Sequence, residues 1–192
     1  MRLNGKEDLR IRKTVTIIRR TFERMIIKMD YEQITEKMLA EEAMMNVKTF
    51  YSYYSSLAEL VMEFQSEMAD EFISIIKKHK IPEELDQINS EFITALSQRG
   101  LAYERIMMST NFGYVNFKTM EKLLNEIYKD DTNYTEAEMF KRKVLINFVN
   151  TTSLDVYRKW VDIGKKIPLR DVIDLSSKLI VSGTKDLIKK ED

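Results

Sequence analysis

The sequence predicts an all-α protein, and three observations support this fold class. Apolar residues recur at intervals of three and four along the whole chain, which is the period of an amphipathic helix. Only 2 Pro and 5 Gly occur among 192 residues, so turn positions are few and the helices between them are long. Residues that begin and end helices bracket the periodic segments. No segment shows a convincing strand pattern, and we expect about nine helices.

The first three predicted helices follow one another closely near the N-terminus, with only short connections between them. An apolar stripe runs through the first helix, 7–29, and Asp30-Tyr31 ends it. Thr35 has the side chain of an N-cap for a second helix, 36–43, and Asn46 has that of a third, 47–53. Three helices with a tight turn between the second and the third predict a helix-turn-helix. The apolar stripe of the first helix consists of Ile11, Val15, Ile18, Phe22, Met25, Ile26 and Met29.

The sequence predicts six further helices after the first three. Ser55-Ser56 caps a long fourth helix, Pro82 and Gly100 bracket a fifth, and a sixth covers 101–112. The remaining three are a seventh at 116–129, an eighth from the Thr135–Glu138 capping box to Gly164, and a ninth from Pro168 to about Lys189. We expect a helix-turn-helix DNA-binding domain at 1–55 and a helical regulatory and dimerisation domain at 56–192.

Composition narrows the class of protein. Hydrophobic residues make up 44% and charged residues 32%, as in folded proteins rather than disordered ones. The absence of cysteine excludes disulfides and thiolate metal sites. The longest apolar runs, such as 144–146, are too short to span a bilayer, and the N-terminus lacks a secretory apolar region, so we expect a cytoplasmic protein. The net charge is zero, but nine basic and three acidic side chains in residues 1–28 give that segment +6. Such a charge suits a phosphate backbone, although a solvated helix face would look the same.

The run Thr49-Phe50-Tyr51-Ser52-Tyr53-Tyr54 is the most specific motif of the chain. With its neighbours it resembles the signature of the TetR family of regulators, over about residues 10–65. The resemblance implies a homodimeric regulator that binds a palindromic DNA operator, and a repressor role with release by a small-molecule inducer. It also implies that the last two helices pack across the dimer axis. The positions in register are Thr35, Ala40, Ala43, Thr49, Phe50, Tyr51, Tyr53, Ser56 and Leu60.

The resemblance assigns DNA contacts to polar residues around the third helix. Thr35 would cap the second helix and touch a phosphate, and hydroxyls of the third helix would donate to phosphates. Lys37 and the Arg-rich first helix would add electrostatic attraction, while Phe50 and Tyr54 would point into the core. The expected DNA-binding residues are Thr35, Lys37, Asn46, Val47, Lys48, Thr49, Tyr51, Ser52 and Tyr53.

Three positions depart from the family pattern. Met44 stands where the family has its turn glycine, and a non-glycine residue in a left-handed turn costs on the order of 1 kcal/mol. Leu57 replaces a phosphate-binding lysine, so one backbone contact is expected to be lost. Asn46 replaces the usual serine and caps equally well.

The C-terminal helices carry aromatic and methionine side chains that could line a ligand pocket. A packed core would show the same helical spacing, and for any single residue it is the stronger interpretation. The candidate ligand-binding residues are Phe92, Tyr103, Met107, Phe112, Phe148, Thr151, Tyr157 and Trp160.

Other functional classes receive less support from the sequence. His79 is the single histidine, lies among lysines and is expected to be exposed. No metal-binding motif, phosphate-binding loop or nucleophile motif is present, so we expect no enzyme, no metal and no cofactor. The alternative is a helical interaction module, or an activator that works through a protein co-regulator, with a divergent or weak DNA-binding head.

Overall fold

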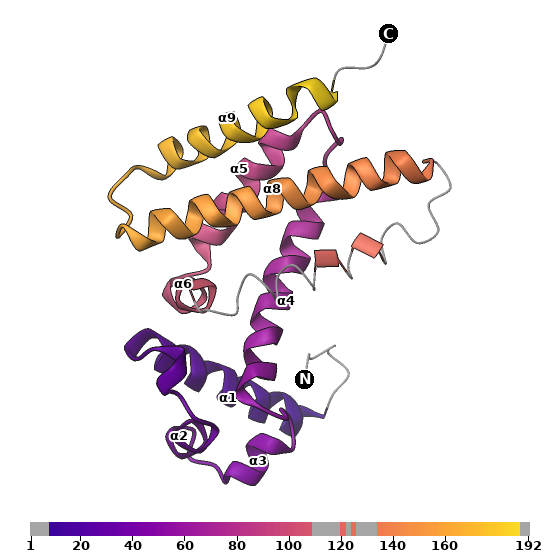
Figure 1. Ribbon diagram of the computed structural model, residues 1–192. Helices are drawn as coiled ribbons and strands as arrows, with labels where there is room; N and C mark the ends of the chain where they lie inside the picture. The colour runs from indigo at the N-terminus through magenta and orange to yellow at the C-terminus, as the bar shows by residue number, and fades with distance from the viewer. Residues whose placement is uncertain (1–7, 109–119, 122–123, 126–133, 189–192) are drawn as a thin grey trace. The chain divides into compact units, whose positions relative to one another are not determined.

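The computed structural model describes residues 8–108, 120–121, 124–125 and 134–188 (Figure 1). These residues form helices and contain no strand, which confirms the predicted all-α class. Within this part of the chain, no helix combines the length and the apolar character needed to cross a membrane. The chain folds as two compact units, the first comprising Met1–Glu67 and Arg99–Val115 and the second Met68–Gln98 and Asn116–Asp192.

The first unit is built around α1, whose buried face carries Val15, Ile18 and Phe22. The ring of Phe22 packs against that of Phe64 in α4, with centroids 5.7 Å apart. Burial of an aliphatic or aromatic side chain of this size stabilises a fold by about 1.5–3 kcal/mol, so this face holds the unit together. The helical elements are α1 (Leu9–Lys28), a 3-10 turn η1 (Tyr31–Gln33), α2 (Glu36–Glu42), α3 (Val47–Tyr51), the beginning of α4 (Leu57–Ile76) and α6 (Leu101–Met108).

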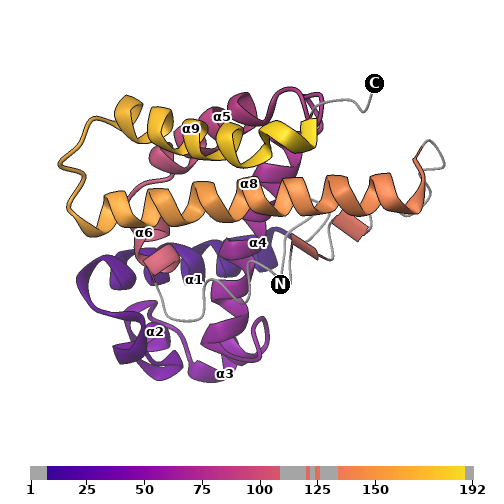
Figure 2. The ribbon, with the colours of Figure 1, turned by 45° about the horizontal axis from the view of Figure 1, so that its top comes forward.

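The second unit contains the rest of α4, α5 (Leu85–Gln98), α8 (Glu136–Asp162) and α9 (Leu169–Ile188). The two views agree that α8 and α9 lie side by side and run in opposite directions (Figures 1 and 2). A Cβ placed on Gly183 would lie 3.1 Å from the Phe148 ring, so glycine allows α9 to approach α8 this closely.

A buried polar cluster joins three helices of the second unit. The side-chain amide nitrogen Nδ2 of Asn89, in α5, donates to the Ser176 and Ser177 hydroxyls of α9, at 2.9 and 2.8 Å. Its carbonyl oxygen accepts from the Ser153 hydroxyl of α8 at 2.7 Å. Because a buried polar group without a hydrogen-bond partner is costly, this cluster favours the observed register of α5, α8 and α9.

The predicted helix boundaries agree closely with the observed ones where a side-chain cap marks the start of the helix. Thr135 and Glu138 form the expected capping box at the start of α8. The fifth helix begins at Leu85 rather than at Pro82, because residues 81–84 form a turn. The predicted seventh helix lies largely outside the described residues. The compact units divide the chain within α4 and assign α6 to the first unit, whereas the sequence suggested a single boundary after residue 55.

Candidate nucleic-acid interface

Buried aromatic side chains pack the α2–α3 pair against the core of the first unit. Phe50 and Tyr54 are buried, with ring centroids 5.7 Å apart, as the sequence predicted for both. Leu57 is buried as well, and its backbone amide donates to the Glu36 carboxylate at 2.9 Å. Leu57 therefore serves the packing of α4 against α2, and it leaves no side chain at this position to contact a phosphate.

Each helix of the pair begins at a side-chain cap. The Thr35 hydroxyl accepts from the Met38 backbone amide at 3.2 Å, and the side-chain oxygen Oδ1 of Asn46 accepts from the Lys48 backbone amide at 2.8 Å. Both caps satisfy a backbone donor that a helix start leaves free. The first turn of α3 is thus held in place by Asn46 although the helix spans only Val47–Tyr51.

Met44 forms the turn between α2 and α3 in a left-handed conformation, with φ at 53°. Its side chain is 96% exposed and contributes no packing. Replacing Met44 with glycine should therefore raise the free energy of unfolding by about 0.5–1 kcal/mol, because the left-handed strain outweighs the extra chain entropy of glycine. Thermal unfolding checks this. Met62→Gly, at an exposed position inside α4, is the matched control and should lower stability by about 1 kcal/mol. A destabilised Met44→Gly variant would contradict the argument.

The predicted DNA-binding residues lie together on the outer surface of α2 and α3. Six of them are exposed, while Val47, Thr49 and Tyr53 are half-buried. Lys48, Tyr51 and Ser52 share one face of α3 because residues three and four apart align on a helix. The Ser52 hydroxyl donates to the Lys48 carbonyl at 2.9 Å. The exposed members are Thr35, Lys37, Asn46, Lys48, Tyr51 and Ser52.

Arg19 departs from the expectation that the arginines of the first helix attract DNA. Its guanidinium pairs with Glu63 at 2.5 Å and with Glu67 at 2.8 Å, and it lies 4.1 Å from the centroid of the Phe64 ring. Burial alone would lower the pKa of Arg19, but the charges and hydrogen bonds of the two carboxylates outweigh it and raise the pKa. Arg19 thus joins α1 to α4, and its charge is compensated inside the first unit.

Tyr103 extends this network to α6. Its hydroxyl donates to Glu67 at 2.7 Å, and its ring meets Phe64 edge to face at 5.4 Å. Burial, followed by the hydrogen bond and the charge of Glu67, raises the pKa of Tyr103 to about 12. Tyr103 is therefore a structural member of the first unit, although the sequence suggested a ligand-binding role.

The Tyr103 phenol predicts an alkaline loss of stability. Between the unfolded pKa near 10 and the folded pKa of about 12, the unfolded chain releases a proton that the folded chain keeps. The free energy of unfolding should accordingly fall as pH rises through this window. Tyr103→Phe should make the fall shallower, as measured by urea unfolding at pH 9 to 12. Tyr51→Phe, at an exposed tyrosine, is the control. Equal slopes for Tyr103→Phe and the parent protein would contradict the assignment.

The remaining ligand-binding candidates are not gathered around one space in the described residues. Phe92 packs on Phe72 with centroids 4.5 Å apart, and Tyr157 packs on Trp160 with centroids 5.5 Å apart. Met107 is buried in the first unit. Phe148 and Thr151 lie exposed on α8, and Phe112 lies outside the described residues. A common pocket for this set remains a prediction.

His79 is not exposed as the sequence suggested, since only 11% of its side chain is accessible. Its Nε2 lies 2.9 Å from Glu91 and its Nδ1 lies 3.3 Å from Glu84. The backbone amide of Lys80 also donates to Glu84 at 2.7 Å, and this bond is the main reason why the pKa of Glu84 is lowered. His79 therefore links the turn after α4 to α5. Within the described residues, no group of three or more His, Cys, Asp or Glu side chains could hold a metal ion.

An apolar groove of about 400 Å³ opens in the second unit where α8 leads into α9. The indole N–H of Trp160 donates to the Ile167 carbonyl at 2.6 Å and so fixes the connection. Leu175 lines the groove and is 56% exposed. The exposed side chains of Val144 and Phe148 on α8, and of Leu179 on α9, leave further apolar area uncovered.

Comparison with solved structures shows the same fold in bacterial transcriptional regulators. The fatty acid degradation regulator FadR from Bacillus halodurans is 14% identical with a TM-score of 0.60, covering 92% of this chain and 96% of that one. FadR from Bacillus subtilis, in complex with stearoyl-CoA, is 16% identical with a TM-score of 0.60, covering 88% and 98%. A TetR transcriptional regulator from Streptococcus agalactiae 2603V is 17% identical with a TM-score of 0.57, covering 89% and 95%. No protein-family model and no curated protein matches the sequence. The resemblance to TetR-family regulators is thus confirmed at the level of the fold.

Proposed function

We propose that the chain is a TetR-like transcriptional regulator that binds a palindromic operator as a homodimer. The observation that carries the proposal is the capped α3 helix, which presents Lys48, Tyr51 and Ser52 to solvent while Phe50 anchors it from behind. A short helix held in this way can enter the major groove, where its first residues meet base edges and its hydroxyls meet phosphates. In a cell it would act in the cytoplasm, as a repressor that a small molecule releases.

The direct test is selection of binding sequences from random duplex DNA, followed by titration at several salt concentrations. We expect a palindrome whose half-sites are centred about 34 Å apart, and an affinity that falls steeply with salt as phosphate-bound counterions are released. A reporter gene behind the selected site separates repression from activation. Failure to enrich any sequence, together with weak binding that does not depend on salt, would reject the function in favour of a helical interaction module.

The α8–α9 face supports the homodimer. An exposed apolar row on two adjacent helices suits a four-helix bundle with a second copy, and a twofold axis would place the same row on both sides. Uncovered apolar side chains at Phe148, Leu175 and Leu179 are otherwise costly in water. A palindromic operator has the same twofold symmetry as such a dimer, so the two parts of the proposal are consistent with each other.

A charge in the centre of this face should separate the protomers. Leu179 is 50% exposed, so Leu179→Asp costs the monomer little but buries an unpaired carboxylate in the dimer. We expect a monomer at micromolar concentration by analytical ultracentrifugation, with helical content unchanged. Leu101→Asp, at a similarly exposed leucine in the first unit, should remain dimeric. A dimeric Leu179→Asp variant would place the interface elsewhere.

Release by an inducer requires a ligand whose affinity differs between the DNA-bound and free protein. Stearoyl-CoA, which FadR from Bacillus subtilis holds in its structure, is a reasonable first probe. Calorimetry with and without the selected operator should give two different affinities for an inducer. Equal affinities would mean that the molecule is not an inducer.

A further inference from the structure

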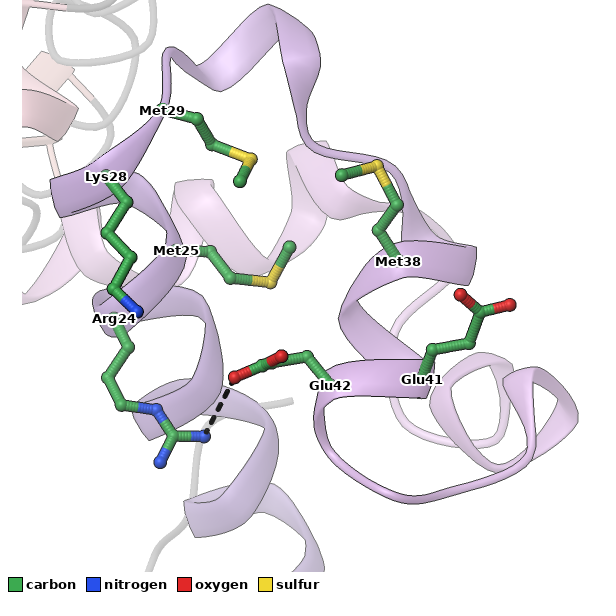
Figure 3. Close-up of a pocket in the computed structure, with 7 residues that line it drawn as sticks. All are labelled: Arg24, Met25, Lys28, Met29, Met38, Glu41 and Glu42. Carbon is green, nitrogen blue, oxygen red and sulfur yellow. Dashed lines mark ion pairs between the residues drawn. The ribbon is translucent and has the colours of Figure 1, made fainter.

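A pocket of the first unit and the groove of the second unit have different linings. The pocket, of about 460 Å³ between the end of α1 and α2, is lined by four charged residues besides three methionines, and the Arg24 guanidinium lies 4.0 Å from the Glu42 carboxylate (Figure 3). Water suits such a lining. The groove at the α8–α9 connection is lined mainly by apolar side chains, so its fitting occupant is an apolar group. These side chains are Val156, Trp160, Ile163, Ile167, Val172 and Leu175.

An apolar side chain protrudes near the other end of α8. Phe140 is 71% exposed, and it lies on one face of the helix with Val144 and Phe148, since these residues follow one another at intervals of four. Phe140 lies eight residues before Phe148, and Val156 in the groove lies eight residues after it. At a rise of about 1.5 Å per residue, the protruding ring and the groove lie at equal distances from Phe148, in opposite directions.

A twofold axis that passes Phe148 at right angles to α8 would bring these two ends together. A twofold interface is self-complementary, because a residue i that meets residue j is met in turn by j. With the two α8 helices antiparallel, Phe140 of one protomer lies opposite the partner's Val156, at the groove. Lys141 and Asp155 are exposed and lie seven residues either side of Phe148, so they too oppose one another, as unlike charges.

The alternative twofold arrangement has its axis parallel to the helices. It places α8 of one protomer against α9 of the other, so the two grooves face each other. Asp155 and Asp171, which line the groove, would then meet the partner's Asp171 and the partner's Asp155. Facing like charges weaken an interface, and an unfilled hollow between two grooves leaves its lining without contacts. The antiparallel arrangement therefore has the better packing and the better charge pairing.

We propose that Phe140 fills the groove of the partner subunit and that Lys141 pairs there with the partner's Asp155. This pairing rests on the homodimer proposed above and specifies which residues meet in it. Trp160 is the single tryptophan of the chain and lines the groove, so its fluorescence reports whether the groove is filled. Burial of the Phe140 ring against this indole is the kind of aromatic contact in which interfaces are enriched.

Charge exchange is the first test, with the dimer dissociation constant of the full-length chain measured by analytical ultracentrifugation. Lys141→Asp and Asp155→Lys should each weaken the dimer by about tenfold or more, because like charges then face each other at two places. The double variant Lys141→Asp/Asp155→Lys should regain most of the lost affinity. Lys77→Asp, at an exposed lysine after α4, is the control and should dimerise like the parent protein.

Phe140→Ala tests the filling of the groove. It should weaken the dimer by about tenfold or more and shift the Trp160 emission to the red at concentrations where the parent is dimeric. Helical content should stay unchanged because Phe140 is exposed in the single copy. Leu101→Ala, at an exposed leucine of the first unit, is the matched control.

Cross-linking then maps the arrangement, since the chain has no cysteine of its own. A mixture of the Lys141→Cys and Asp155→Cys proteins should form a disulfide-linked dimer. A stable dimer that instead links Asp155→Cys to Asp171→Cys, or that is indifferent to Phe140→Ala, would overturn the pairing and leave the homodimer standing. A parent protein that stays monomeric at high concentration would reject the homodimer itself and the pairing with it.

Discussion

The double variant Lys48→Ala/Tyr51→Ala is expected to lose about 100-fold or more in affinity for the selected operator while its fold stays intact. Lys48 supplies the positive charge of the exposed α3 face, and Tyr51 supplies a hydroxyl on the same face. One base or phosphate contact of this kind is worth about 1–3 kcal/mol, so two together account for a loss of this size. Tyr51 is 52% exposed, so its removal should change the melting temperature little.

Fluorescence anisotropy with labelled operator measures this loss, and circular dichroism verifies the fold. Lys78→Ala, which removes an exposed lysine after α4, is the control for general electrostatic effects. Binding to a scrambled duplex separates the two contributions, because loss of a phosphate contact weakens all duplexes alike. Retained affinity in a folded double variant would show that another surface binds the DNA.

Arg19→Met is expected to lower the free energy of unfolding of the first unit by about 2–4 kcal/mol. Methionine keeps an aliphatic stem but removes the guanidinium, which lies over the Phe64 ring and is the shared cation of the Glu63 and Glu67 carboxylates. The Glu63 side chain is only 7% exposed, and removal of one partner from a buried ion pair is strongly destabilising. The partial exposure of Arg19, at 17%, keeps the expected loss below that of a fully buried pair.

Urea unfolding quantifies this loss, and Arg20→Met, on the exposed side of α1, is the matched control. Adding Glu63→Gln to Arg19→Met should restore part of the stability, because it removes the uncompensated charge. A double variant that is less stable than Arg19→Met alone would assign the loss to packing rather than to charge.

The elements of the first unit were readable from the sequence because their signals are local. The α1 stripe and the Thr35 and Asn46 caps depend on residues within a turn or two of one another. The inward positions of Phe50 and Tyr54 followed from the resemblance to the TetR signature. The apolar pattern of the ninth helix was less informative. Apolar residues recur at helical spacing along α9, yet Val172 and Ile180 are buried whereas Leu175 and Leu179 are about half exposed. Periodicity identifies an apolar face, but it does not show how much of that face the rest of the chain covers.

The environment of individual charged groups was not readable in the same way. Arg19 resembles its exposed neighbour Arg20 in sequence, yet it lies between two carboxylates more than 40 residues away. His79 lies among lysines in sequence and between Glu84 and Glu91 in space. The i,i+4 spacing of Glu63 and Glu67 was the one available sign that α4 presents a pair of carboxylates on one face.

The amino-acid order by itself therefore determined an all-α chain and the helix-turn-helix segment, and its resemblance to the TetR signature gave outward positions to Lys48, Tyr51 and Ser52. Only the tertiary structure decided that Arg19 is paired with carboxylates of α4 and that Tyr103 packs with α4 in the first unit. The physical reason is range. Helix period and capping act over three or four residues, whereas ion pairing and burial depend on which distant segments pack together.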